Sequence, residues 1–279
     1  RFLERFAGLR LIGLDRDPDA MSIAGRRLAP FGDRVTLVRT RYDGIAGALR
    51  ESGLAPTGSV DGVLFDLGVS SMQLDRPERG FSYAKDAPLD MRLNPSEGQP
   101  ASELLKRAGH NELVQAVRDF GEESKWYRVV SAIEDARGSD RLERTLSFAK
   151  LVEEAVGPRR PGSRIHPATK TFQGVRIAVN RELAVIESAL PAAFEKLSEG
   201  GRLAAISFHS LEDRIVKRFF RRMAGRPEHG RDSLPGQFRV RRAALITRKP
   251  LVADEAEAAR NPRSRSAKLR ILEKERKAA

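Results

Sequence analysis

Short apolar runs alternate with helical patterns along the 279 residues of this chain, and no other feature constrains its fold as strongly. The apolar runs, which predict buried strands, are residues 9–14, 35–38, 60–67 and 202–208. Helical periodicity of apolar residues occupies residues 18–28, 45–49, 171–197 and 211–223, and Ser210 is the expected N-cap of the last helix. Strands and helices that alternate at this spacing form a parallel sheet with right-handed crossovers. The sequence therefore predicts an α/β fold.

The middle of the chain interrupts this alternation. Residues 69–99 lack periodicity and read as a long loop, and loops of this length are commonly functional or disordered. Residues 100–165 carry several helical patterns and no convincing strand, which predicts a helical insertion. We expect residues 1–99 and 166–279 to form the two parts of the core. Near the end of the chain, two short extended stretches are expected, around residues 238–242 and 268–272.

The positive charge of the chain is concentrated at its end. Residues 214–279 contain 20 basic and 7 acidic residues, and their net charge of +13 equals that of the whole chain. A localised basic region favours a polyanionic partner, because each cation placed on a phosphate releases a counterion. A solvated surface explains the same charge pattern equally well. The chain has no Cys, which excludes disulfides, thiolate nucleophiles and Cys-ligated metal centres.

An acidic residue ends the first apolar run. In doubly wound folds a carboxylate at the end of a strand accepts hydrogen bonds from a ribose diol. We assign that role to Asp15 and the cap of the following helix to Asp17, although either residue suits a simple cap. A glycine-rich turn should precede the acidic residue by about 20 residues. Only 14 residues precede Asp15, so we expect the first strand and its glycine loop to be missing from this chain.

A second carboxylate, Asp66, leaves a wholly apolar strand and enters a Gly/Ser loop. At that position it faces the ligand crevice, where its charge needs a hydrogen-bond donor. A helix cap is the alternative, and we disfavour it because no helical pattern follows.

Polar residues also follow the fourth apolar run, at Ser207, His209 and Ser210. A Ser-His pair is typical of hydrolases, but the Gly-x-Ser-x-Gly turn is absent. We therefore expect His209 to form hydrogen bonds or contact RNA. His166 precedes the long helical pattern and either caps it or lines the site. No spacing of His and acidic residues indicates a metal site.

Several long motifs resemble the bacterial 16S ribosomal RNA (cytosine-N4)-methyltransferase family, and the resemblance covers essentially the whole chain. These motifs begin with Asp66-Leu67-Gly68-Val69-Ser70-Ser71-Met72-Gln73-Leu74-Asp75, Arg79-Gly80-Phe81-Ser82 and Pro88-Leu89-Asp90-Met91-Arg92. They continue with His166-Pro167-Ala168-Thr169-Lys170-Thr171-Phe172-Gln173, Ile206-Ser207-Phe208-His209-Ser210-Leu211-Glu212-Asp213-Arg214 and Asn261-Pro262-Arg263-Ser264-Arg265-Ser266-Ala267-Lys268-Leu269-Arg270.

The resemblance implies a class I, Rossmann-like methyltransferase that uses S-adenosylmethionine and carries an inserted all-helical domain for substrate recognition. It implies a cytoplasmic enzyme that methylates a cytosine in the decoding region of the small-subunit rRNA. Matched residue by residue, the cofactor contacts are Asp15, Tyr42, Asp66 and Gln73. Tyr42 stands where the family commonly has Phe. Asp66 is also the candidate catalytic residue, as an acceptor near the reacting amine.

The RNA is expected to contact both the loops and the basic end of the chain. The candidate contacts are Ser70, Ser71, His166, His209, Ser210, Arg263 and Arg265, and Phe81 or Phe208 should stack on the base. Without the glycine loop, we expect the chain as given to bind the cofactor poorly. The main alternative to a methyltransferase is therefore a non-catalytic RNA-binding or ribosome-associated module. An NAD-dependent dehydrogenase fits the strand-end motifs less well.

Overall fold

The predicted alternation of strands and helices is confirmed by a computed structural model, which describes residues 1–53, 59–158 and 166–276. Backbone contacts divide the chain into two units. The first joins Arg1–Gly68 to Leu183–Ala279, and the second is Val69–Glu182. The expected helical insertion at residues 100–165 lies within the second unit, and its end at residue 165 falls outside the described residues.

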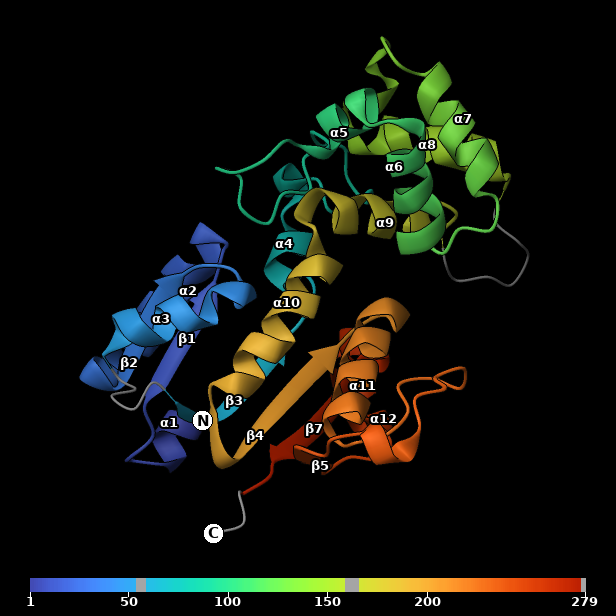
Figure 1. Cartoon of the computed structure of the whole chain (residues 1–279). Helices are drawn as coiled ribbons and strands as arrows, with labels where there is room; N and C mark the ends of the chain where they lie inside the picture. Colours follow the sequence, from blue (N-terminus) through green and yellow to red (C-terminus); the bar gives the residue numbers. More distant parts are fainter. Residues whose placement is uncertain (54–58, 159–165, 277–279) are drawn as a thin grey trace. The chain divides into compact units, whose positions relative to one another are not determined.

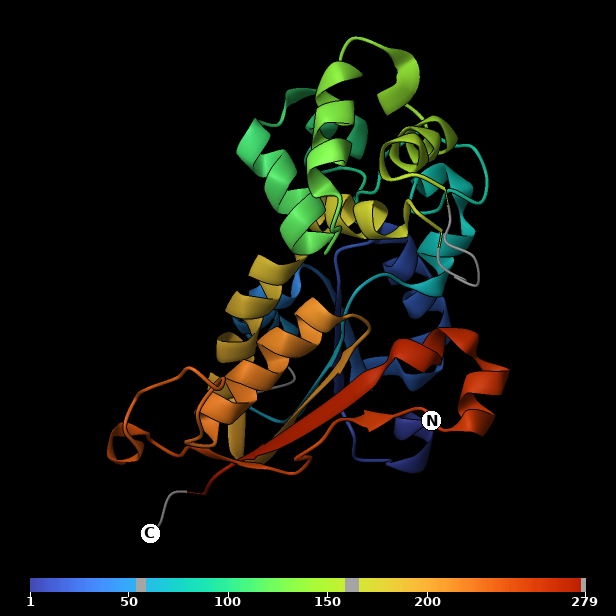
Figure 2. The ribbon, with the colours of Figure 1, turned by 90° about the vertical axis from the view of Figure 1, so that its right-hand side faces the viewer.

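Two sheets form the first unit (Figures 1 and 2). In the smaller sheet, β1 (Leu11–Asp15) pairs in parallel with β2 (Val35–Arg39). In the larger sheet the strand order is β3-β4-β7-β5, with β6 also paired to β7. These strands are β3 (Val60–Asp66), β4 (Leu197–Ser207), β5 (Ala243–Leu245), β6 (Leu251–Val252) and β7 (Lys268–Lys274). The β3–β4 pairing is parallel, as predicted, whereas β7 runs antiparallel to β4, β5 and β6.

Helices cover the strands of this unit. They are α1 (Phe2–Arg5), α2 (Pro18–Leu28), α3 (Ile45–Ser52), α10 (Glu182–Glu195), α11 (Ser210–Met223) and α12 (Glu255–Arg260), and α10 begins at the last residue of the second unit. Figure 1 shows α10 and α11 running alongside β3 and β4. The core joins strand residues such as Phe65 and Leu203 to Phe194 of α10 and Phe220 of α11. Burying each such side chain contributes about 1.5–3 kcal/mol, so one shared core holds strands and helices together.

Three local predictions are wrong, and one strand boundary shifts. The single helix expected at residues 171–197 is broken at Arg181, whose left-handed φ of 52° separates α9 from α10. The strand expected at 202–208 starts earlier, at Leu197, with an irregularity in its register against β3. The extended stretch expected at 238–242 moves to β5, because the polypeptide pairs where β7 offers partners. The N-cap of α11 is His209, so Ser210 is its first residue.

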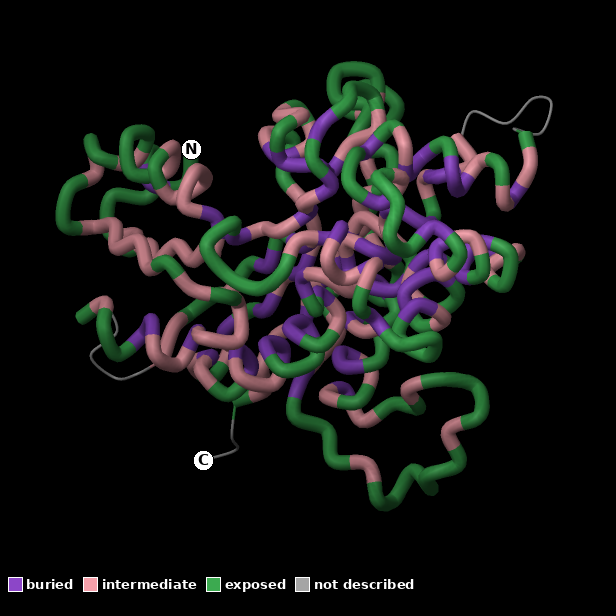
Figure 3. The backbone as a smooth tube through the Cα atoms, turned by 90° about the horizontal axis from the view of Figure 1, so that it is seen from above, coloured by how far each residue is buried: buried purple, intermediate pink, exposed green. Residues whose placement is uncertain are grey.

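The second unit is helical. Its helices are α4 (Ser71–Asp75), α5 (Ala101–Arg107), α6 (His110–Val114), α7 (Trp126–Asp135), α8 (Thr145–Val156) and α9 (Thr169–Asn180). A π-helical segment, η4 (Gln115–Phe120), continues α6. Their apolar side chains form a separate core that includes Leu105, Ile133 and Phe148. Figure 3 colours the backbone by burial, with buried stretches in purple and exposed stretches, such as loops, in green. Among the described residues, no helix combines the length and apolar character that a membrane span requires.

The long loop that precedes α5 is held by specific hydrogen bonds. The side chain of Asn180 donates to the Met91 carbonyl (2.7 Å) and accepts from the Leu93 amide (2.8 Å). The buried Arg79 donates to the carbonyl of Leu93 (3.0 Å). A Cβ at Gly80 would lie 2.5 Å from the Pro88 carbonyl oxygen, and its φ is +71°. Glycine is therefore required there, because other residues disfavour that backbone conformation and the space is filled.

A second close approach joins α9 to η4. A Cβ at Gly174 would lie 2.0 Å from the Ala116 carbonyl oxygen and 2.7 Å from the Gly121 nitrogen. Both neighbours are backbone atoms, so a side chain at Gly174 would push the two helical segments apart.

We predict that Gly174→Ala lowers the free energy of unfolding by about 1–3 kcal/mol, the usual cost of overpacking a core. Gly25→Ala is the matched control, because it also lies within a helix but has open space around its Cβ position. That change should leave stability equal or raise it by about 0.5–1 kcal/mol. Denaturant unfolding followed by circular dichroism measures both, and equal stabilities of the two variants would contradict the prediction.

Candidate functional site

Carboxylates end two parallel strands of the first unit. Asp15 is the last residue of β1 and Asp66 is the last residue of β3. Asp66 lies beside Ile206 of β4 in the parallel register, so the residues that follow β4 start next to it. Ligands of open α/β sheets bind at this edge, beyond the carboxyl ends of the strands.

The N-cap that we predicted at Asp17 is confirmed. Asp17 is fully buried and its side chain accepts the Asp19 amide hydrogen at 2.9 Å, which makes it the N-cap of α2. Asp15 Oδ1 accepts from the Asp17 amide at 2.8 Å. The backbone amide of Arg16 also donates to this carboxylate. Burial raises the pKa of Asp15 above its ordinary value, although the hydrogen bond from Asp17 opposes that effect.

Tyr42 connects the end of the β1–β2 sheet to β3. Its hydroxyl donates to the Asp66 carbonyl oxygen at 3.0 Å. Its ring meets the Phe65 ring edge-on, with 5.7 Å between centroids. The hydroxyl, which a Phe at this position would lack, therefore has a hydrogen-bond partner in the protein. This bond fixes the aromatic ring beside Asp66.

Asp66 itself has an unsatisfied carboxylate. Among the described residues, no group donates a hydrogen bond to its side chain. Partial burial raises the pKa of Asp66, and the charge of Glu212 raises it further. Two carboxylates thus lie close together at the edge of the sheet, where the charge of Glu212 disfavours the ionisation of Asp66.

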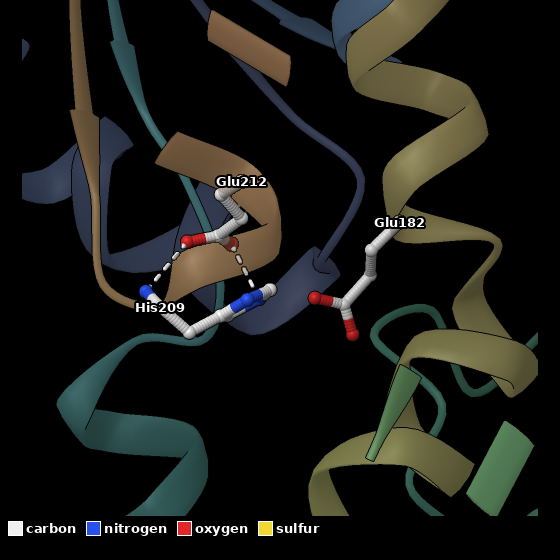
Figure 4. Close-up of side chains that lie close together, drawn as sticks. All are labelled: Glu182, His209 and Glu212. Atoms are coloured by element: carbon white, nitrogen blue, oxygen red, sulfur yellow. Dashed lines mark hydrogen bonds and ion pairs between the residues drawn. The ribbon is translucent and has the colours of Figure 1, made fainter. Parts of the chain in front are cut away.

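Glu212 is held rigidly at the start of α11. It is fully buried, and its Oε2 accepts from the amides of Phe208 (2.8 Å) and His209 (3.3 Å). Its Oε1 lies 3.2 Å from His209 Nε2, and that imidazole is 11% exposed. Figure 4 shows the imidazole of His209 turned toward the Glu212 carboxylate. Glu182, also drawn there, belongs to the second unit, where Arg176 donates two hydrogen bonds to it at 2.9 Å.

The loop after β3 approaches the same carboxylate. Gly68 has a φ of +82°, and a Cβ there would lie 3.3 Å from Glu212 Oε1 and 3.9 Å from the Phe208 ring. The backbone at Gly68 therefore passes directly beside Glu212 and Phe208. Of the two aromatic residues predicted to stack on a base, Phe208 lies at this edge. Phe81 is instead 7% exposed in the core of the second unit.

The other predicted cofactor contact, Gln73, lies in the second unit. A helix follows the Gly/Ser loop after all, which corrects our expectation, but its cap is Ser70 and not Asp66. The Gln73 amide donates to Ser70 Oγ (3.3 Å), and Gln73 Oε1 accepts from the Ser70 amide (2.9 Å), so the pair forms a capping box. Ser71, the first residue of α4, is exposed.

The remaining predicted site residues are scattered. His166 Nδ1 accepts from the Ala168 amide at 3.1 Å, and its ring stacks on Tyr83 with 4.7 Å between centroids. It therefore caps the turn that leads into α9. Ser210 is exposed at the start of α11. Arg263 and Arg265 are exposed in the 3₁₀ helix η7 (Pro262–Ser266).

Sequence reasoning missed Glu212 as a member of the site. The available signal was a carboxylate five residues after a strand end, at the third helical position after His209. That spacing is typical of a capping box, so a structural role alone explains Glu212 in the sequence. The sequence does not show that the same spacing brings its buried negative charge beside Asp66.

The strand ends of the first unit therefore offer acceptors and negative charge. Asp66, at the end of β3, has carboxylate oxygens available for hydroxyl, amine or cationic groups; Tyr42 contributes an aromatic ring beside it, and Asp15 ends β1. Such a site binds a ligand that combines donors, positive charge and a flat ring.

Comparison with known proteins agrees with this chemistry. The model of the MraW methylase family matches residues 1–275. The "Ribosomal RNA small subunit methyltransferase H" of Heliobacterium modesticaldum is 49% identical, over 98% of this chain and 87% of its own length. The proteins of the same name from Mycobacterium avium and a Geobacter species are 50% and 48% identical, over 98% and 95% of this chain and 71% and 84% of their own lengths.

We predict that Glu212→Gln lowers the pKa of Asp66, because the substitution removes a neighbouring negative charge while the glutamine carbonyl still accepts the two amides. The carboxyl carbon of Asp66 followed by NMR against pH measures the change. Glu187→Gln is the charge-matched control, since Glu187 is exposed on α10. A pKa of Asp66 that responds equally to both changes would contradict the arrangement.

Proposed function

The chain belongs to the MraW methylase family, and from this premise we propose that it transfers a methyl group from S-adenosylmethionine to N4 of a cytosine in 16S rRNA. We place that cytosine in the decoding region and the reaction in the cytoplasm. Membership of the family makes the chain a methyltransferase of the class I, Rossmann-like α/β type. The names of the relatives support rRNA of the small subunit as the substrate.

The observation that carries this proposal is the state of Asp66. Its carboxylate lies at the end of β3, has a raised pKa and accepts no hydrogen bond from the described residues. Asp66 is exposed at the end of β3, so a ligand that brings donors or positive charge can reach its carboxylate.

The residues present fit the cofactor. Asp15 would accept hydrogen bonds from the ribose hydroxyls, since each carboxylate oxygen can accept more than one, and Tyr42 would pack its ring beside the adenine. Asp66 and Gln73 would make the further contacts that the resemblance implies. When bound, the cofactor supplies a methyl group on a positively charged sulfur, and the negative charges of Asp66 and Glu212 favour a cation at this edge.

Asp66 is also the best acceptor for the cytosine amine. The N4 lone pair is delocalised into the ring, so N4 is a weak nucleophile until an acceptor polarises its N–H bonds. Methylated N4 would carry an extra proton, and the carboxylate of Asp66 would accept that proton. The raised pKa makes Asp66 a stronger base than an ordinary aspartate, and correct positioning supplies much of the rate.

The cytosine must be unpaired or flipped to reach this edge. We propose that Phe208 stacks on it, because Phe208 lies beside Gly68 and Glu212. The exposed Ser210, Arg263 and Arg265 are proposed to contact the surrounding RNA, together with Ser70, Ser71 and His166 of the second unit. His209 is 11% exposed, so its main contact is Glu212 and any contact with RNA is through its edge.

A non-catalytic RNA-binding module is not favoured, because the matched relatives are named as methyltransferases and Asp15, Tyr42, Asp66 and Gln73 are all retained. Calorimetric titration of the full-length protein with S-adenosylmethionine separates the two functions. The enzyme binds the cofactor, and a module with a defunct site does not.

We predict that Asp66→Asn lowers methyl transfer roughly 10²–10⁴-fold, the range that a general base contributes. The assay supplies labelled cofactor and small subunits that lack the modification, and mass spectrometry identifies N4-methylcytosine. Asp61→Asn is the matched control on the same strand, and it should retain activity because Asp61 lies toward the other end of β3. Full activity of Asp66→Asn would remove this residue from the mechanism, and no N4-methylcytosine from the otherwise unmodified full-length protein would refute the function.

A pH dependence follows from the same carboxylates. Asp66 accepts a proton only when ionised, so the rate should fall as the pH drops through its raised pKa. Glu212→Gln removes the charge that raises this pKa, so the acidic limb of the rate profile should move to lower pH. A limb that stays in place, measured as kcat against pH, would mean that another group sets it.

A further inference from the structure

A small basic pocket lies in the first unit, apart from the carboxylates. Its volume is about 60 Å³, enough for a small anionic group. The lining residues are Lys217, Phe220, Arg221, Arg226, Leu245, Thr247, Arg248 and Arg270. Five of them are cations and none is acidic, so the pocket repels cations and attracts anions.

Several of these cations lack partners. Among the described residues, the side chains of Arg226 and Arg248 make no hydrogen bond or ion pair. Lys217 interacts with Asp213 only through longer-range attraction. The Nε of Arg221 donates to the Pro227 carbonyl oxygen, and its two terminal nitrogens make no hydrogen bond with the described residues. The surplus charge is therefore available to a ligand.

The buried member of the pocket is Arg270, which is 8% exposed. Its Nε and Nη2 donate to the two carboxylate oxygens of Asp213, at 2.7 and 3.1 Å. Burial favours the neutral form of Asp213, but these bonds and the neighbouring lysines hold its pKa below the ordinary value. Arg270 Nη1 has no acceptor among the described residues. This leaves a positioned guanidinium donor on the wall of the pocket.

Regular structure fixes the exposed cations. Gly225, with a φ of +64°, ends α11 in a Schellman motif: its amide donates to the Arg222 carbonyl oxygen (3.0 Å), and the Arg226 amide donates to that of Arg221 (2.9 Å). On the other side, Thr247 Oγ1 accepts from the Ile271 amide at 2.9 Å, which holds the chain next to Arg248 against β7. The backbone at Arg226 and next to Arg248 is thus held in place by hydrogen bonds.

We propose that this pocket binds a phosphate group of the RNA backbone. Guanidinium groups match the geometry of phosphate oxygens, and the buried Phe220 at the pocket lowers the local dielectric and strengthens the attraction. The basic residues continue along one face of α11, at Arg214, Lys217, Arg218 and Arg221. A row of cations that leads into the pocket favours a chain of phosphates over a single free anion. The proposal rests on the proposed function, since it assigns a contact to the same RNA substrate.

The test compares the double variant Arg226→Gln/Arg248→Gln with the unmodified protein. A labelled fragment of 16S rRNA is titrated by fluorescence anisotropy at several salt concentrations. We expect the variant to bind about tenfold more weakly at low salt, with a slope of log affinity against log salt that is smaller by about 1–2. The charge-matched control is Arg27→Gln/Arg50→Gln, two exposed arginines on α2 and α3. It should keep the affinity and slope of the unmodified protein.

An unchanged slope in the pocket variant, or equal losses in the two double variants, would overturn the proposal. A second titration uses inorganic phosphate at constant ionic strength. Phosphate binding that the pocket variant loses while it keeps its affinity for RNA would make the pocket a site for free anions and would also overturn it. Unfolding midpoints of all variants establish that they are folded.

The result is separable from the proposed function. Asp66→Asn should lose methyl transfer yet keep its affinity for RNA and its salt slope. If the unmodified protein forms no N4-methylcytosine but the pocket variant still loses RNA binding, the function fails and the phosphate site stands. If methylation occurs and the pocket variant binds RNA normally, the phosphate site fails and the function stands.

Discussion

The pairing of β4 on both of its edges is the interaction on which the rest of the first unit depends. Its backbone bonds in parallel to β3 and antiparallel to β7. The parallel pairing brings the end of β3 beside the start of α11, so Asp66 and Glu212 become neighbours although 145 positions separate them in the sequence. The antiparallel pairing places Arg270 next to Asp213. Both charged sites of this unit are therefore consequences of one strand.

The fold could be predicted from the sequence where local pattern and long-range packing agree. Each of the four apolar runs became a strand, because runs of buried residues have few alternatives in a parallel sheet. The break at Arg181 escaped prediction, since the apolar period continues across it and only the left-handed backbone reveals it. The antiparallel direction of β7 was also beyond local pattern, because strand direction depends on pairing partners far away in the sequence.

The site was predicted in part for the same reason. Asp15, Asp17 and Asp66 could be placed because strand ends define where they lie. Glu212 could not, since its charge matters only through a neighbour on another strand. Conversely, the Arg79-Gly80 and Met91 motifs looked functional in the sequence and are explained structurally. Gly80 permits a close backbone approach, while Arg79 and Asn180 satisfy carbonyl groups in a loop without regular pairing.

Helix α11 joins the two charged sites. Its 14 residues span about 20 Å, with Glu212 and Asp213 in the first turn and Arg221 and Arg222 in the last. This order matches the helix dipole, which favours negative charge at the start and positive charge at the end. The proposed catalytic site and the proposed phosphate site are thus held at a fixed separation by one rigid helix.

The division of the chain also orders its folding during synthesis. The second unit is continuous from Val69 to Glu182, so all of its core residues are synthesised within one stretch of the chain. The first unit is discontinuous: β3 must wait for β4, and β4 for β7, whose last residue is Lys274. The helical unit can therefore fold while the sheet is still incomplete. The strand that carries Asp66 acquires its partners only after more than 130 further residues have been made.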